Sequence, residues 1–106
     1  MPHSHLAAPY FKNVQSLEIL RDKTILVTGL SGWIGKWIIE GVEYLNSTHK
    51  FNTKIVGITR SIERFAAEFP KAKKISELQL IELDLKSDTL KKYVTRKIDY
   101  IININI

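Results

Sequence analysis

Cysteine is absent from this chain of 106 residues. Disulfide bonds and thiolate metal sites are therefore excluded, and a reducing compartment is compatible with the composition. No apolar run approaches the roughly 20 residues that a membrane-spanning helix needs. Residues 1–6 also lack the charged start and apolar centre of a secretory signal peptide. We therefore expect a cytoplasmic protein with no membrane partner.

A concentrated basic patch is also lacking, although the formal net charge is +5. The lysines and arginines are spread along the predicted helices, and no DNA- or RNA-recognition motif accompanies them. Solvated helix faces therefore explain the charge better than a nucleic-acid site does. His3 and His5 lie in an N-terminal arm with no further ligand nearby, so a metal site there is not favoured.

Glycine is scarce, with five residues in all, yet three of them lie at positions 29, 32 and 35. They follow the apolar run 24–28 and precede a helical pattern, which is the layout of a dinucleotide-binding turn. Gly29 allows a sharp turn off the strand. Gly32 leaves room for a pyrophosphate, and Gly35 allows the helix to approach its strand closely. The free amide groups of the new helix favour phosphate.

Strands and helices alternate along the rest of the chain. Hydrophobic patterning predicts strands at 24–28, 54–59, 78–83 and 98–103, and helices at about 32–45, from Ser61 to Pro70, and after Ser87. This alternation predicts an α/β fold, a Rossmann-type parallel sheet with helices on both faces and strand order 3-2-1-4. In the first helix, Trp33 and Trp37 are expected to pack on the sheet, with base stacking as the alternative.

The segment Thr28-Gly29-Leu30-Ser31-Gly32-Trp33-Ile34-Gly35 resembles the Thr-Gly-x-x-Gly-aromatic-Ile-Gly fingerprint of the extended short-chain dehydrogenase/reductase family. That family includes NAD-dependent nucleotide-sugar epimerases, dehydratases and reductases. The resemblance covers roughly residues 22–103, the cofactor half of the family fold, and implies a dinucleotide cofactor. It implies that residues 29–35 line the cofactor site.

The length of the chain leaves room for one βαβ half of this fold and part of the next. We expect residues 1–22 to form an arm and residues 23–106 to form a partial NAD(P)-binding domain. The arm is expected to be anchored on the sheet by Leu17 and Leu20. The chain then corresponds to a fragment or a naturally short product.

The end of the second predicted strand bears on the choice of cofactor. An acidic residue there would accept hydrogen bonds from the ribose hydroxyls of NAD. This chain has Thr59, Arg60 and Ser61 instead. The guanidinium of Arg60 suits a 2′-phosphate, and Ser61 adds a hydroxyl, so NADP is favoured and NAD stays an alternative. Arg60 as a solvent-facing residue is the alternative interpretation.

The ends of strands three and four carry the remaining candidates. By the resemblance, Asp84 would accept from the adenine amino group and Leu85 would cover the base, whereas a helix-start Asp84 is the alternative. Asn103 would lie on the cofactor side of strand four. The family places small residues after it, and this chain has the bulkier Ile104 and Asn105.

A catalytic Tyr-x-x-x-Lys pair lies beyond strand four in the family. Tyr93 and Lys97 have that spacing, but they precede strand four, at the edge of the sheet opposite to the ligand edge. We therefore expect Tyr93 to pack on its helix rather than to catalyse. No catalytic residue is predicted.

Two functions stay open at this point. The first is the cofactor-binding portion of a nucleotide-sugar epimerase, dehydratase or reductase, which binds cofactor without turnover. The alternative is a complete non-catalytic nucleotide-binding or protein-interaction module. The uncharged outer edge of strand four also predicts self-association of the chain.

Overall fold

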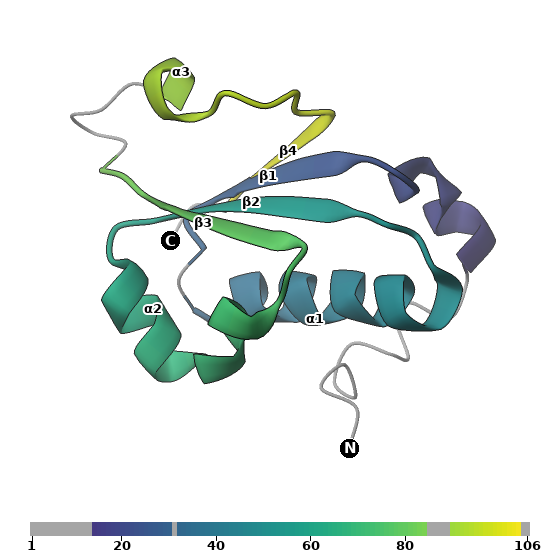
Figure 1. The fold of residues 1–106 in the computed structure, drawn as a ribbon, viewed down its shortest axis with the longest axis horizontal. Coiled ribbons are helices and arrows are strands. Elements are labelled where there is room, and N and C mark those ends of the chain that lie inside the picture. The colour runs from purple at the N-terminus through teal and green to yellow at the C-terminus, as the bar shows by residue number, and fades with distance from the viewer. Residues whose placement is uncertain (1–13, 31, 85–89, 105–106) are drawn as a thin grey trace.

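The computed structural model describes residues 14–30, 32–84 and 90–104. Four parallel strands form one sheet in the order β3-β2-β1-β4. Helices α1 and α2 cover one face of this sheet and the short helix α3 lies over the other (Figure 1). The predicted α/β class, strand order and two-sided cover are therefore confirmed.

The two central strands are buried on both faces, as the apolar runs predicted. Strand β1 spans Thr24–Thr28 and β2 spans Lys54–Thr59. Ile25, Val27 and Ile55 join a core cluster with Ile39 and Val42 of α1, whereas Leu26, Val56 and Ile58 join a cluster with Leu83 on the opposite face. Alternate residues of each strand thus build the two halves of the core.

Helix α1 spans Trp33–His49 and is longer than the pattern predicted. Asn46, just beyond the predicted end of this helix, lies inside it instead. Its side-chain amide donates to the carbonyl of Thr53 at 2.9 Å and its amide oxygen accepts from the Thr53 N–H at 2.8 Å. The helix ends at Lys50, whose φ of 56° is left-handed. A polar residue with a partner across the following turn therefore stays helical.

The first turn of α1 corrects a second prediction. Trp33 does not pack on the sheet, because its side chain is 72% exposed. Burial along α1 begins at Gly35 and continues through Ile39, Gly41, Val42 and Leu45. Trp37 does pack, but against the small cluster of Leu45 and Phe51 rather than on the sheet itself.

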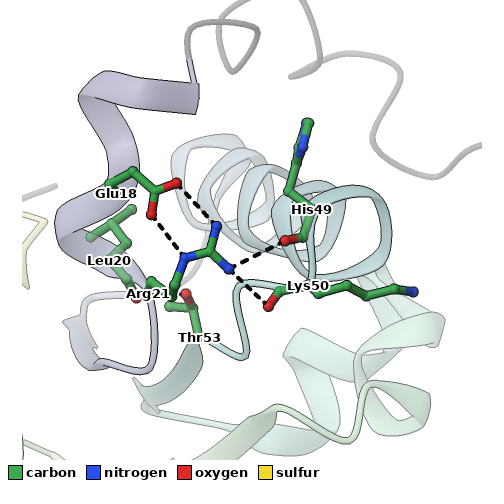
Figure 2. Close-up of polar contacts among 6 residues, drawn as sticks. All are labelled: Glu18, Leu20, Arg21, His49, Lys50 and Thr53. Carbon is green, nitrogen blue, oxygen red and sulfur yellow. Dashed lines mark hydrogen bonds and ion pairs between the residues drawn. The ribbon is translucent and has the colours of Figure 1, made fainter.

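The segment before β1 is the 3-10 helix η2, Val14–Leu20. Leu17 and Leu20 pack against Leu45 and Phe51 at the end of α1. They therefore anchor the segment mainly on the end of the helix, and not only on the sheet as predicted. Figure 2 shows how Arg21 extends this contact.

The guanidinium of Arg21 joins η2 to the carboxyl end of α1. It forms a bidentate pair with Glu18, at 2.8 and 3.0 Å, and donates to the carbonyl oxygens of His49 and Lys50 (Figure 2). It also lies 4.4 Å from the centroid of the Phe51 ring. Carbonyls at a helix end lack helical partners, so this cation satisfies two of them.

Helix α2, Ile62–Glu68, and the 3-10 helix η3, Pro70–Lys74, connect β2 to the edge strand β3, Leu78–Glu82. Ser61 caps α2, as predicted, by accepting from the Arg64 N–H at 3.1 Å. Phe65 and Phe69 insert into the core with their rings edge to face. Gln79 and Glu82 of β3 are exposed.

Helix α3 spans Leu90–Tyr93 and β4 spans Tyr100–Asn103. The predicted start of β4 at Ile98 was two residues early, because Ile98, like Val94, packs against the core cluster that contains Leu26 instead. Tyr93 is 43% exposed, which corrects its predicted packing. Ser87 lies outside the described residues. Among the residues described, no helix combines the length and apolar character that crossing a membrane requires.

Candidate functional site

The carboxyl ends of the four strands meet along one edge of the sheet. Thr28 at the end of β1 is in register with Asn103 at the end of β4, and Thr59 at the end of β2 is in register with Glu82 at the end of β3. In open parallel sheets, ligands bind outside this edge. The candidate site is therefore formed by the segments that follow these strands.

The glycine turn after β1 has the backbone that its sequence predicted. Gly29 has φ of +64° and Gly32 has φ of +90°, a region that residues with a Cβ rarely adopt. Gly32 is the N-cap of α1, and this residue forms no side-chain capping hydrogen bond. The first amide groups of α1 are thus directed out of the turn without a side-chain acceptor from the cap residue, as an anion site requires.

Close packing explains two of these glycines further. A Cβ on Gly29 would overlap the carbonyl oxygen of Ile104, just past β4. A Cβ on Gly35 would overlap the carbonyl oxygen of Leu30, in the turn itself. Gly35 therefore brings α1 against the turn, which is a more specific role than the helix–strand approach expected from sequence.

Leu30 lies in the core and does not line the open edge. Its side chain is fully buried, and its N–H donates to the carbonyl of Ile58 at 3.1 Å. The space for it comes from Gly57 on β2, where a Cβ would overlap a Leu30 methyl group. Leu30 thus positions the turn against β2. The long-range pairing with Gly57 gave no signal in the sequence, so this role was not foreseen.

The segment after β2 holds the three residues considered for cofactor choice. Thr59 is buried, and its hydroxyl donates to the carbonyl of Ser61 and accepts from the Ser61 N–H, both at 3.3 Å. These contacts fold a tight turn between β2 and α2. Arg60 lies at the tip of this turn and is exposed. Its cation is therefore free to meet a ligand approaching the strand end.

Glu82 is a charged residue of this edge that sequence reasoning did not assign to the site. It is exposed, and its Oε1 accepts from the N–H of Ile62 at 2.9 Å. A carboxylate from β3 is thereby fixed beside the turn that carries Arg60. The register of β3 against β2 creates this contact, and a single sequence does not display that register.

The remaining predicted positions are placed as follows. Asn103 accepts a hydrogen bond from the hydroxyl of Thr28 through its Oδ1. The side chain of Ile104 packs against the core cluster on the α1 side. Asp84 is exposed just beyond β3. Ile34, on the first turn of α1, is 42% exposed. Ser31, Leu85 and Asn105 lie outside the described residues.

Lys97 lies toward the opposite edge. It pairs with Asp99 at 3.8 Å, and the Asp99 carboxylate accepts from the N–H of Thr24, the first residue of β1. Tyr93 is the last residue of α3, which lies over the face of the sheet opposite to α1 and α2 (Figure 1). The spacing of Tyr93 and Lys97 therefore does not place both side chains at the carboxyl edge. Among the residues described, no group of three His, Asp or Glu side chains could hold a metal ion.

A parallel sheet in this order, with a glycine turn opening the helix after its first strand, defines a Rossmann-type dinucleotide-binding fold. Comparison with protein families gives the finer assignment: the model of the NAD dependent epimerase/dehydratase family matches residues 25–105. The chain belongs to this family, which confirms the resemblance to extended short-chain dehydrogenases/reductases. Neither curated proteins nor solved structures gave a match.

Proposed function

We propose that residues 23–106 bind a nicotinamide dinucleotide and form the cofactor-binding portion of a nucleotide-sugar epimerase, dehydratase or reductase. The observation that carries this is the glycine turn, with two left-handed glycines and an α1 start that lacks a side-chain cap. The NAD dependence named for the family supports the same cofactor class. The nicotinamide ring would supply hydride chemistry when bound.

The residues present fit such a cofactor. The pyrophosphate would lie against Gly32 and the first amide groups of α1, those of Trp33, Ile34 and Gly35, because these groups offer donors and a favourable dipole. Side chains at Gly29 and Gly35 would displace the backbone that forms this cradle. Asp84 and Leu85 are proposed for adenine, and Asn103 for the side of the site beside β4.

Residues 1–106 are proposed to bind without catalysing. The Tyr-x-x-x-Lys pair of the family is expected beyond strand four, and Lys97, which pairs with Asp99 near the start of β1, lies at the wrong edge of the sheet for that role. The proton transfer that accompanies hydride transfer therefore has no assigned donor among the described residues.

NADP is the proposed preference. Arg60 is exposed at the turn after β2, where the adenosine ribose lies in Rossmann-type sites. Its permanently charged guanidinium can bind a 2′-phosphate through two N–H groups at once. We expect NAD to bind as well, because the proposed contact of Arg60 involves only the 2′-phosphate, and the rest of the dinucleotide is the same in NAD and NADP.

Calorimetric titration of the chain with NAD and NADP tests both proposals. Wild type should bind both dinucleotides, and Arg60→Ala should weaken NADP binding roughly tenfold or more, since a charge-assisted contact is lost. NAD binding should change little. Absence of binding by a folded sample would overturn the dinucleotide proposal.

Lys54→Ala is the matched control for this titration. Lys54 is the first residue of β2, whereas Arg60 directly follows its last, so both variants lose one positive charge at opposite ends of one strand. Equal loss of NADP binding in the two variants would show a general charge effect and would contradict the role of Arg60.

Self-association through β4 is a second proposal. Tyr100, Ile101 and Ile102 are 38%, 65% and 36% exposed, and no charged residue lies within Tyr100–Asn103. An uncharged, apolar edge strand is a template for pairing with another chain. A second copy of this chain is the proposed partner.

A further inference from the structure

The carboxylate of Glu82 is fixed at the edge where the cofactor ribose would bind. Glu82 ends β3 and is in register with Thr59, which ends β2. Its Oε1 accepts from the N–H of Ile62 at 2.9 Å, and the N–H of Leu83 donates to the carbonyl of Thr59 at 2.9 Å. The strand end and the carboxylate are thus both tied to the turn 59–62.

Helix capping involves only one oxygen of this carboxylate, because the N–H that it accepts from belongs to Ile62, the first residue of α2. Ser61 already provides the side-chain cap of α2 through its bond with the Arg64 N–H. Among the described residues, Glu82 has no ion-pair partner, and only its Oε1 forms a hydrogen bond. One carboxylate oxygen is therefore left to face solvent at this edge.

The chemistry of the ribose gives this oxygen a role. A free 2′-hydroxyl, as in NAD, can donate to a carboxylate, whereas a 2′-phosphate, as in NADP, is repelled by it. Rossmann-type sites place that acidic group at the end of the second strand. Here the second strand is followed by Arg60, and the acidic group comes from the neighbouring strand.

We infer that Glu82 is a specificity-determining residue which opposes Arg60: it favours the 2′-hydroxyl and disfavours the 2′-phosphate. This inference rests on the proposed dinucleotide function. Arg60 sets the preference for NADP, and Glu82 limits how large that preference becomes. The chain should therefore discriminate between the two dinucleotides less strongly than Arg60 alone would allow.

The test is Glu82→Gln, because glutamine keeps an oxygen that can accept from the Ile62 N–H but removes the charge. Titrations with NAD and NADP should show NADP binding roughly fivefold tighter than in wild type, with NAD binding unchanged or weaker. The gain should shrink when salt is raised from about 50 to 500 mM, since screening weakens the repulsion.

Glu77→Gln is the matched control. Glu77 directly precedes β3 and Glu82 ends it, so both variants lose one negative charge at opposite ends of the same strand. The ratio of NADP to NAD affinity should rise in Glu82→Gln and stay at the wild-type value in Glu77→Gln. Melting temperatures of both variants show whether either change acts through stability.

The outcomes separate this inference from the proposal on which it rests. If wild type binds both dinucleotides and Glu82→Gln leaves the affinity ratio unchanged, the role of Glu82 is overturned and the cofactor proposal stands. An equal rise of the ratio in Glu77→Gln overturns it too. If folded wild type binds neither dinucleotide, both proposals fail.

Discussion

At the scale of single residues, Gly35 is a position where one added carbon should destabilise the fold through packing alone. Its Cβ would overlap the carbonyl oxygen of Leu30, which belongs to the backbone and has no rotamer to change. We expect Gly35→Ala to lower the free energy of unfolding by about 1–3 kcal/mol, the usual cost of overpacking. Urea unfolding of wild type and variant measures this loss.

Gly57→Ala is the comparison for that variant. Its Cβ would meet a methyl group at the end of the Leu30 side chain, which can rotate away, although Leu30 is fully buried. The loss should therefore be smaller than for Gly35→Ala. A larger loss of unfolding free energy for Gly57→Ala than for Gly35→Ala would show that the backbone around Leu30 moves more easily than the Leu30 side chain does.

The sequence predicted the glycine turn well because the backbone requirement is local. Positive φ at Gly29 and Gly32 follows from the turn alone. The burial of Leu30 could not be predicted in the same way, since it depends on Gly57, on a different strand. The exposure of Trp33 was missed because helical periodicity does not show where along a helix its contact with the sheet begins.

At the scale of elements, the junction between η2 and α1 should respond to pH. The hydrogen bond from Arg21 lowers the pKa of Glu18 below its ordinary value; burial opposes this shift, and the charges of Arg21 and His49 reinforce it. A carboxyl with a lowered folded pKa stabilises the fold above its unfolded pKa, and this contribution disappears as pH falls through the folded value.

Glu18→Gln should therefore flatten the acid side of the stability profile. Between about pH 5 and pH 3, wild type should lose more thermal stability than Glu18→Gln, because the variant has no carboxylate at position 18 to protonate. Glu40→Gln removes the same charge from α1, where Glu40 has no ion pair with a described residue. Parallel acid limbs for wild type and Glu18→Gln would contradict the prediction.

Element boundaries were less predictable than the elements themselves. Strands β1 and β2 were delimited correctly because apolar runs between polar turns mark both ends. The end of α1 was misplaced because Asn46 is satisfied by Thr53, seven residues later, and such a contact offsets its usual preference for helix ends. The start of β4 was misplaced because the apolar side chain of Ile98 packs into the core without its backbone belonging to the strand.

At the scale of the whole molecule, the exposed edge of β4 predicts concentration-dependent association. The weight-average mass from light scattering should rise over about a thirtyfold range of protein concentration. Ile101→Lys should suppress the rise, because a charge on an edge strand opposes pairing and Ile101 is 65% exposed in the monomer.

Ala67→Lys is the control for this experiment, since it adds the same charge at an exposed position on α2. It should associate like wild type. A constant monomer mass for wild type, or equal suppression by both variants, would contradict an interface at β4.

The sheet order was predictable because each strand is followed by a helix and the glycine turn identifies β1 as the first strand of a Rossmann-type sheet. Contacts between the ends of neighbouring strands could not be predicted, because they depend on the register of the strands. Glu82 beside the turn of Arg60 is such a contact. The sequence therefore predicted the glycine turn of the candidate site, but of the two charged residues Arg60 and Glu82 it indicated only Arg60.

The exposure of Trp33 also has an optical consequence. The chain has two tryptophans: Trp33, on the first turn of α1, is 72% exposed, whereas Trp37 is half-buried and packs beside Leu45 and Phe51. Their fluorescence should therefore separate into a solvent-quenchable and a shielded component. Because reduced nicotinamide absorbs where tryptophan emits, a reduced dinucleotide bound at the glycine turn would lower the fluorescence of Trp33, which allows binding to be followed without a label.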